Sequence, residues 1–193
     1  MIFIIYRIVD ALDLVGRLDA DLTREFGPEA VFRDMTRLEG GQDWTKVLEH
    51  NAKTRPVMLA VIGLTWQTVA YPDGDWQGVP RLWNPEDWVR REITLALDAA
   101  QTVIPVLCNG ATMPPEGWLK QCGLERLHRL QAVVLRSTEY ETDLRRLLDV
   151  LVRRCPALHT SRQDMAQQAA SSSVVAHGNA DSPLTMMIFL PLS

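Results

Sequence analysis

The sequence predicts an α/β domain with a five-stranded parallel sheet flanked by helices. Short apolar runs of strand length alternate along the chain with segments whose apolar residues recur at helical spacing, which is the pattern of β-α-β units. A length of 193 residues with 47% hydrophobic and 23% charged residues suits one globular domain with a tail. We expect the flavodoxin-like strand order 2-1-3-4-5, in which ligands bind beyond the carboxyl ends of the strands.

The predicted strands are the five apolar runs at residues 2–6, 30–33, 57–62, 103–107 and 132–135. A first helix follows Asp10 and ends at Gly27-Pro28, and others are predicted over residues 44–53 and 141–153. A further helix has explicit start signals, with Asn84 as its N-cap, Pro85 at its first position and two acidic residues behind them. We therefore expect a crossover helix to begin at Asn84.

Composition divides the chain into a domain over residues 1–158 and a tail over residues 159–193. Residues 160–183 are rich in Ser, Gln, Ala and Asp without an apolar period, which is typical of a flexible linker. The apolar stretch at 186–190 is far too short to span a bilayer. It is the start of another domain, a docking segment for a sensor or effector partner, or a frayed end without a role.

Several classes of function are disfavoured by composition. The net charge is −4 and the 20 basic residues are scattered, so no nucleic-acid partner is expected. Three distant cysteines fit no disulfide framework, and four histidines lack metal-ligand spacing, so no metal site is expected. The apolar opening lacks a basic n-region and is predicted to be a strand, with no membrane partner. We expect a reducing, cytoplasmic location.

Candidate ligand-binding residues follow the predicted strands. Tyr6 and Arg7 follow the first strand, and residues 63–66 follow the third. Arg33 is the last residue of the second strand, and Asp34 follows it. The segment from Arg33 to residue 41 is polar and bears glycines, so backbone amides and basic groups there could hold a pyrophosphate. The alternative is an ordinary loop between a strand and a helix.

Glu92 is the strongest candidate for chemistry. It lies at the edge of an apolar helical stripe, one turn after Trp88, and we expect it to be half buried. Positions three and four residues away on its helix hold no Lys or Arg that could pair with it. A carboxylate beside an indole is a candidate site. The alternative is a solvated glutamate, or one paired with a distant arginine.

Four segments, in order along the chain, resemble motifs of the TIR domain family. They are FIIYR at 3–7, the stretch from FRD at 32–34 to LEGG at 38–41, WVRRE at 88–92 followed by ITLAL, and VIPVL at 103–107. The similarity in spacing and order covers residues 1 to about 155. It is greatest to bacterial TIR domains of anti-phage systems that cleave NAD⁺.

The resemblance implies roles for individual residues. Glu92 takes the position of the family's catalytic glutamate, with Trp88 beside it. The residues that lie where the family contacts NAD⁺ are Tyr6, Arg7, Arg33, Asp34, Gly41, Trp66 and Trp88. NAD⁺ is then a substrate and no cofactor is expected, while other TIR domains are expected as partners by self-assembly.

The implied reaction is cleavage of the nicotinamide-ribosyl bond. A carboxylate in a partly dry cleft stabilises positive charge on the ribose, and nicotinamide departs neutral without a general acid. Three alternatives stay open: a TIR module that assembles without catalysis, a phosphoacceptor receiver domain and a nucleoside-transferring enzyme. The receiver alternative lacks its lysine after the fifth strand, where this chain has Arg136-Ser137. Linear and cyclic ADP-ribose products also stay open.

Overall fold

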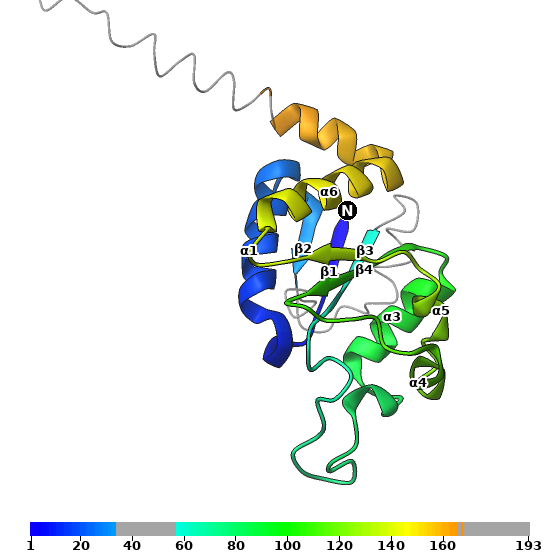
Figure 1. Cartoon of the computed structure of the whole chain (residues 1–193). Helices are drawn as coiled ribbons and strands as arrows, with labels where there is room; N and C mark the ends of the chain where they lie inside the picture. Colours follow the sequence, from blue (N-terminus) through cyan, green and yellow to red (C-terminus); the bar gives the residue numbers. More distant parts are fainter. Residues whose placement is uncertain (34–56, 166, 168–193) are drawn as a thin grey trace, which may run out of the picture.

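The computed structural model describes residues 1–33, 57–165 and 167, and its centre is a five-stranded sheet (Figure 1). The strand order is β2-β1-β3-β4-β5 and every pairing is parallel, which confirms the predicted order. The strands are β1 (Ile2–Ile5), β2 (Val31–Arg33), β3 (Val57–Ile62), β4 (Thr102–Cys108) and β5 (Val133–Leu135). Each lies within one or two residues of its prediction.

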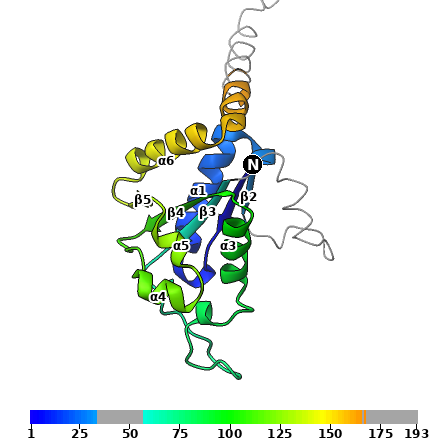
Figure 2. The ribbon, with the colours of Figure 1, turned by 90° about the vertical axis from the view of Figure 1, so that its right-hand side faces the viewer.

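Helices cover both faces of the sheet, as Figures 1 and 2 show. On one face α1 (Ile8–Phe26) and α6 (Tyr140–Arg154) share a core cluster with Ile2 and Ile4 of β1. On the other face α3 (Trp88–Asp98), α4 (Glu116–Gln121) and α5 (Glu125–His128) pack on side chains that include Ile5 of β1. Because neighbouring side chains of a strand point to opposite faces, β1 is buried on both sides.

Helix α1 begins earlier than the sequence predicts and ends where expected. Its first turn, from Ile8, is separated from the rest by non-helical dihedral angles at Ala11 (φ −145°, ψ 16°). At the other end Gly27 adopts φ 89°, a left-handed conformation that side chains disfavour, and its amide donates to the carbonyl of Thr23. The Gly27-Pro28 stop is therefore confirmed.

The β3–α3 connection, residues 63–87, extends beyond the body of the domain at the bottom of Figure 1. An antiparallel bridge joins Ala70 to Pro80, and the amide of Arg81 donates to the carbonyl of Val69 at 2.9 Å. A short 3-10 turn, η4 (Arg81–Trp83), leads toward α3. These backbone contacts give the connection a fixed shape of its own, which the sequence analysis does not predict.

Past α6 the chain forms more helix than the sequence predicts. Residues 156–165, most of them in the predicted linker, are helical, because Leu158 is buried and Arg162 forms an ion pair with Glu25 of α1. Met165 lies against Gly27. The predicted helix at 44–53 and most of the tail lie outside the described residues. Within the described ranges, no helix combines the length and apolar character needed to cross a membrane.

Candidate functional site

The carboxyl end of β1 contributes the first predicted site residues. Tyr6 and Arg7 follow the strand directly and lead into α1. Arg33 ends β2, whose register places it opposite Ile4 of β1, so the backbone of β2 ends at the same edge of the sheet. Asp34 and Gly41 lie outside the described residues. The structure therefore places the ends of β1 and β2 at the predicted ligand-binding edge.

A buried ion pair connects this edge to α3. Arg7 donates through Nη2 to Oδ1 of Asp87 at 2.8 Å and through Nη1 to Oδ2 at 3.1 Å. The two side chains are only 5% and 3% exposed, although 80 residues separate them in sequence. A bidentate arginine-carboxylate pair fixes direction as well as distance. It therefore orients the first turn of α3 relative to the end of β1.

The start of α3 differs from the prediction. Asp87, rather than Asn84, is the N-cap, and its Oδ1 accepts a hydrogen bond from the amide of Arg90 at 3.0 Å. Asn84 instead caps a turn before the helix, because its Oδ1 accepts from the amide of Glu86 at 2.9 Å. Its Nδ2 also donates to the hydroxyl of Tyr71 at 3.0 Å. The predicted start of the helix is therefore wrong by one helical turn. Asn84 and Pro85 belong to a separate turn that precedes the helix.

Glu92 lies on the buried face of α3. Its neighbours on that face are Val89, Ile93 and Ala96, and its side chain is 2% exposed where the sequence predicts half burial. Half burial is therefore wrong, because Glu92 lies on the same face of α3 as residues of the core cluster. Burial of a carboxylate is unfavourable unless it is compensated, so Glu92 is a candidate for a specific role.

A cleft of about 370 Å³ brings together three of the predicted site residues, Tyr6, Arg7 and Trp88. Trp88 is 48% exposed there and lies one helical turn before Glu92. The cleft also has walls that the sequence analysis missed, from the β3–α3 connection and the start of α1. The additional lining residues are Ile8, Val9, Tyr71, Arg81, Glu86, Asp87 and Val89. Aromatic rings beside basic groups suit a ligand with a planar base and anionic groups.

Trp66 does not join this cleft. Its side chain is 1% exposed, packs in the core with Ile62 and Leu82, and lines a separate cavity of about 160 Å³ with Gly63 and Gly110. The structure therefore does not bring Trp66 together with Tyr6, Arg7 and Trp88, and a contact between Trp66 and a ligand stays a prediction.

The turn after β3 is held by Asp10 of α1. Its carboxylate accepts hydrogen bonds from the amides of Gly63 at 2.8 Å and Thr65 at 2.7 Å, and from the Thr65 hydroxyl at 2.8 Å. A Cβ atom at Gly63 would clash with the Asp10 carboxylate, so a larger residue there would have to displace that side chain. The position of Asp10 in the sequence indicates only a helix start, and nothing in the pattern indicates this second role.

Cysteine chemistry is disfavoured at this edge. Cys108 ends β4 and is buried, with its thiol donating to the carbonyl of Ile62 at 3.5 Å. Burial, with the nearby charge of Asp10 second, raises the pKa of the Cys108 thiol to about 11. At neutral pH the group is a thiol rather than the nucleophilic thiolate.

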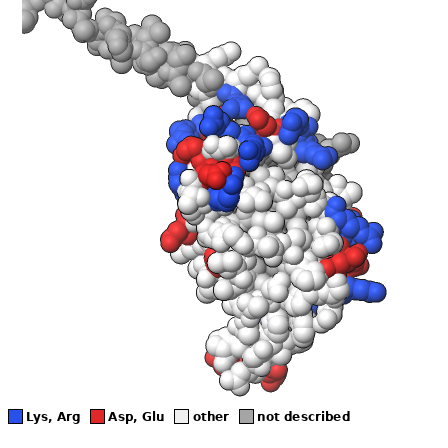
Figure 3. Space-filling view, viewed as in Figure 1, with Lys and Arg blue, Asp and Glu red and all other residues white. Residues whose placement is uncertain are grey.

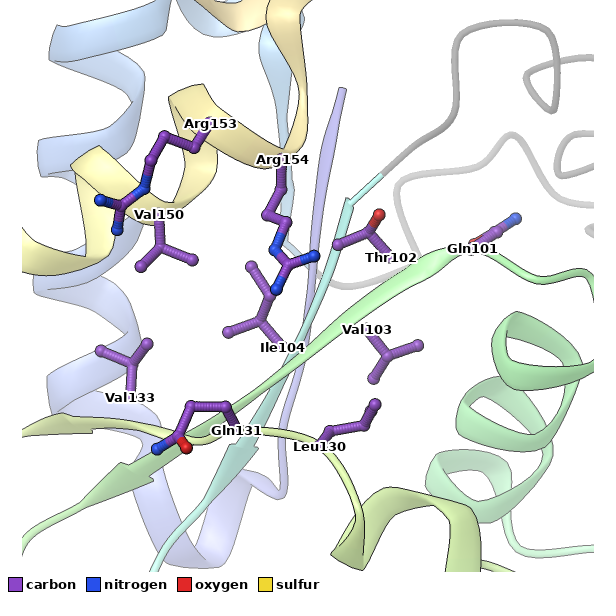
Figure 4. Close-up of a pocket in the computed structure, with 10 residues that line it drawn as sticks. All are labelled: Gln101, Thr102, Val103, Ile104, Leu130, Gln131, Val133, Val150, Arg153 and Arg154. Atoms are coloured by element: carbon purple, nitrogen blue, oxygen red, sulfur yellow. The ribbon is translucent and has the colours of Figure 1, made fainter.

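A larger cavity, of about 710 Å³, lies at the opposite end of β4 (Figure 4). Arg153 and Arg154 of α6 stand over apolar side chains that include Ile104, and no acidic residue is among the lining residues. Basic side chains, with acidic ones among them, gather over α6 on the surface in Figure 3, where the basic residues of the helix itself are all arginines. Without a carboxylate, this cavity offers nothing to stabilise a developing cation.

Strand order, layers and a cleft beyond β1 define a doubly wound α/β domain with its candidate site at the carboxyl edge. A family model described as TIR domain matches residues 2–148. The chain belongs to the TIR domain family.

A solved structure of plant Roq1, described as the TIR domains of the activated resistosome directly recognizing the pathogen effector XopQ, is similar at 17% identity. The match covers 84% of this chain and 82% of that chain, with a TM-score of 0.39. No curated protein matches.

Proposed function

We propose that this TIR domain cleaves NAD⁺ at the nicotinamide-ribosyl bond, with Glu92 as the catalytic carboxylate. One observation carries the proposal: Glu92 is buried on α3 one turn beyond Trp88, which with Tyr6 and Arg7 lines the cleft at the end of β1. Glu92 also takes the position of the catalytic glutamate in NAD-cleaving TIR domains. The nicotinamide end of the substrate then extends past Trp88 toward Glu92.

The proposed chemistry needs few groups. The bond between the ribose C1′ and the nicotinamide nitrogen breaks, its electron pair stays with the ring, and nicotinamide leaves neutral. The Glu92 carboxylate stabilises the cationic ribose and accepts hydrogen bonds from its hydroxyls. Water then attacks C1′ and loses a proton to solvent to give ADP-ribose, or a nucleophilic group of the same molecule attacks C1′ and loses its proton to give a cyclic isomer. The described lining of the cleft includes no histidine, and the departure of neutral nicotinamide requires no general acid.

The remaining predicted contacts belong to the same proposal. Tyr6 and Trp88 supply aromatic faces to the cleft. The contacts predicted for Arg33, Asp34 and Gly41 remain part of the proposal, and Asp34 and Gly41 lie outside the described residues. Trp66 supports the neighbouring turn, through its packing beneath the end of β3. We place the activity in bacterial immune signalling or NAD depletion, in the cytoplasm, with self-assembly of TIR domains raising the rate. Activity per molecule that is equal in dilute and concentrated protein would contradict the role of assembly.

The test measures nicotinamide release from NAD⁺ by chromatography, in reactions with a high protein concentration. The intact chain is compared with Glu92→Ala, and we expect a decrease of about 10² to 10⁴ in rate. Equal release by the two proteins would remove Glu92 from the mechanism. Absence of release by the intact chain, even when assembly is forced, would favour a TIR module that assembles without catalysis.

A further inference from the structure

The β3–α3 connection places a second arginine, Arg81, in the cleft. Arg81 lines it together with Tyr6 and Trp88, although it lies outside every segment that resembles the family. Its backbone is fixed, because its amide donates to the carbonyl of Val69 and the neighbouring Pro80 is bridged to Ala70. The side chain is therefore presented to the cleft from a defined position.

The other charges that line the cleft are already compensated. Both terminal nitrogens of Arg7 are engaged by Asp87, in a pair that is almost fully buried. Glu86 accepts a hydrogen bond from Arg91 at 3.3 Å. An arginine whose two terminal nitrogens both donate to one carboxylate has few donors left for a phosphate. The contact with NAD⁺ predicted for Arg7 therefore acts through α3 rather than through the anionic part of the ligand.

The side chain of Arg81 differs from that of Arg7 in its contacts. Its Nε lies 4.0 Å from Oδ2 of Asp87, too far for a hydrogen bond, and has no hydrogen-bond partner among the described residues. The guanidinium carbon lies 5.0 Å from the ring centroid of Tyr71, whose hydroxyl is held by Asn84. The side chain is 41% exposed. A fixed aromatic ring thus supports a cation at the lining of the cleft, where two arginines and two acidic residues balance in number.

We propose that Arg81 binds the phosphate groups of the substrate and is the residue that selects a pyrophosphate-bearing nucleotide in this cleft. The inference rests on the proposed function, because it assigns a role within the same site. A guanidinium forms two parallel hydrogen bonds to phosphate oxygens, and such charge-assisted bonds are strong where water is partly excluded. Tyr71 is a positioning residue, since it keeps the guanidinium beside the cleft rather than extended into solvent.

The kinetic test uses Arg81→Met, which keeps an unbranched apolar stem and removes the guanidinium with its charge. We expect KM for NAD⁺ to rise about 10-fold to 100-fold while kcat changes less than about threefold, because the phosphates are bound equally in the ground and transition states. Arg81→Lys restores part of the loss. Arg24→Met, on the exposed end of α1, is the control and leaves both constants unchanged. A fall in kcat with unchanged KM would overturn the assignment.

A binding measurement separates this inference from the proposed function. ADP is titrated into the intact chain, into Arg81→Met and into Glu92→Gln, and heat is measured by calorimetry. We expect Arg81→Met to weaken ADP binding at least about 10-fold and Glu92→Gln to leave it unchanged. If the intact chain releases no nicotinamide but binds ADP through Arg81, the proposed function fails and the phosphate site stands. Equal binding by Arg81→Met, or no binding by the intact chain, would overturn the phosphate site.

Discussion

Two arginine-aspartate pairs of this domain have the same chemistry and different consequences. In each, an arginine follows the carboxyl end of a strand and forms two hydrogen bonds to the aspartate of a helix start: Arg7 after β1 with Asp87, and Arg136 after β5 with Asp143 of α6. The first joins residues 80 apart, and the second joins residues 7 apart. One pair therefore connects distant parts of the chain, whereas the other closes a local turn.

The surroundings of the two pairs also differ. Both side chains of the first pair are buried and line the cleft. In the second pair Arg136 is 37% exposed, and Asp143 also accepts from the Arg136 amide at 3.0 Å and from Arg146 at 3.3 Å. Loss of the first pair therefore affects stability and the geometry of the site together. Loss of the second affects stability alone.

The largest effect is expected for Asp87→Asn. Asparagine still accepts from the Arg90 amide as an N-cap, so the change isolates the ion pair and leaves the Arg7 charge buried without its partner. We expect a loss of about 3 to 5 kcal/mol in the free energy of unfolding and at least about a 10-fold decrease in nicotinamide release. Urea unfolding measures the free energy, and the release assay measures the activity. A stable variant with full activity would show that the pair does not orient α3.

Gly63→Ala tests the neighbouring link between the end of β3 and α1. The new Cβ displaces the Asp10 carboxylate, which then loses its contacts with the amides of Gly63 and Thr65. We expect a loss of about 2 kcal/mol in the free energy of unfolding, measured by urea titration. Asp10→Ala is the matched control and should give a similar loss. A neutral Gly63→Ala would mean that the turn accommodates the methyl group by a small shift.

Asp143→Asn is expected to lower Tm by about 5 °C at pH 7 and to leave nicotinamide release unchanged. The hydrogen bond from Arg136 is the main cause that lowers the pKa of Asp143 from 3.8 to about 2. Because the folded-state pKa is depressed, this contribution to stability is complete above about pH 4 and is lost as pH falls toward 2. Calorimetric scans of both proteins should therefore converge at low pH. A Tm difference that is constant over this window would argue against the charge as its cause.

The smallest effect is expected for Arg24→Ala. The pair between Arg24 and Asp21 lies on the exposed surface of α1, three residues apart. We expect a change below about 0.5 kcal/mol in the free energy of unfolding, and no change in activity. A loss comparable with that of Asp143→Asn would mean that exposure does not separate strong from weak pairs in this domain.

The sheet could be predicted because its strands are continuous apolar runs, as at 57–62, where all six residues of β3 are buried. The start of α3 could not, because Asn84-Pro85 is a helix signal that is equally good at capping a turn. Helices α4 and α5 were missed, since they are short and lack a repeated apolar period. Helical residues beyond Leu158 depend on contacts with α1 that local composition does not encode.

Part of the candidate site could be predicted from position alone. Tyr6, Arg7 and Trp88 meet in one cleft because strand ends and helix starts share an edge of a parallel sheet. Arg81 and Tyr71 could not be found in this way, because they reach the cleft from the middle of a long connection. The pairing of Arg7 with Asp87 was also hidden, since nothing in the sequence relates residues 80 apart.

We claim that Glu92 acts on the reaction rather than on substrate binding. The measurement is a single-turnover assay of nicotinamide release by Glu92→Gln with protein in excess, together with the Kd for NAD⁺ of the same protein. We expect Kd within about threefold of that of the intact chain and a rate of release lower by about 10² to 10⁴. An unchanged rate, or a loss that disappears at saturating NAD⁺, would contradict the claim.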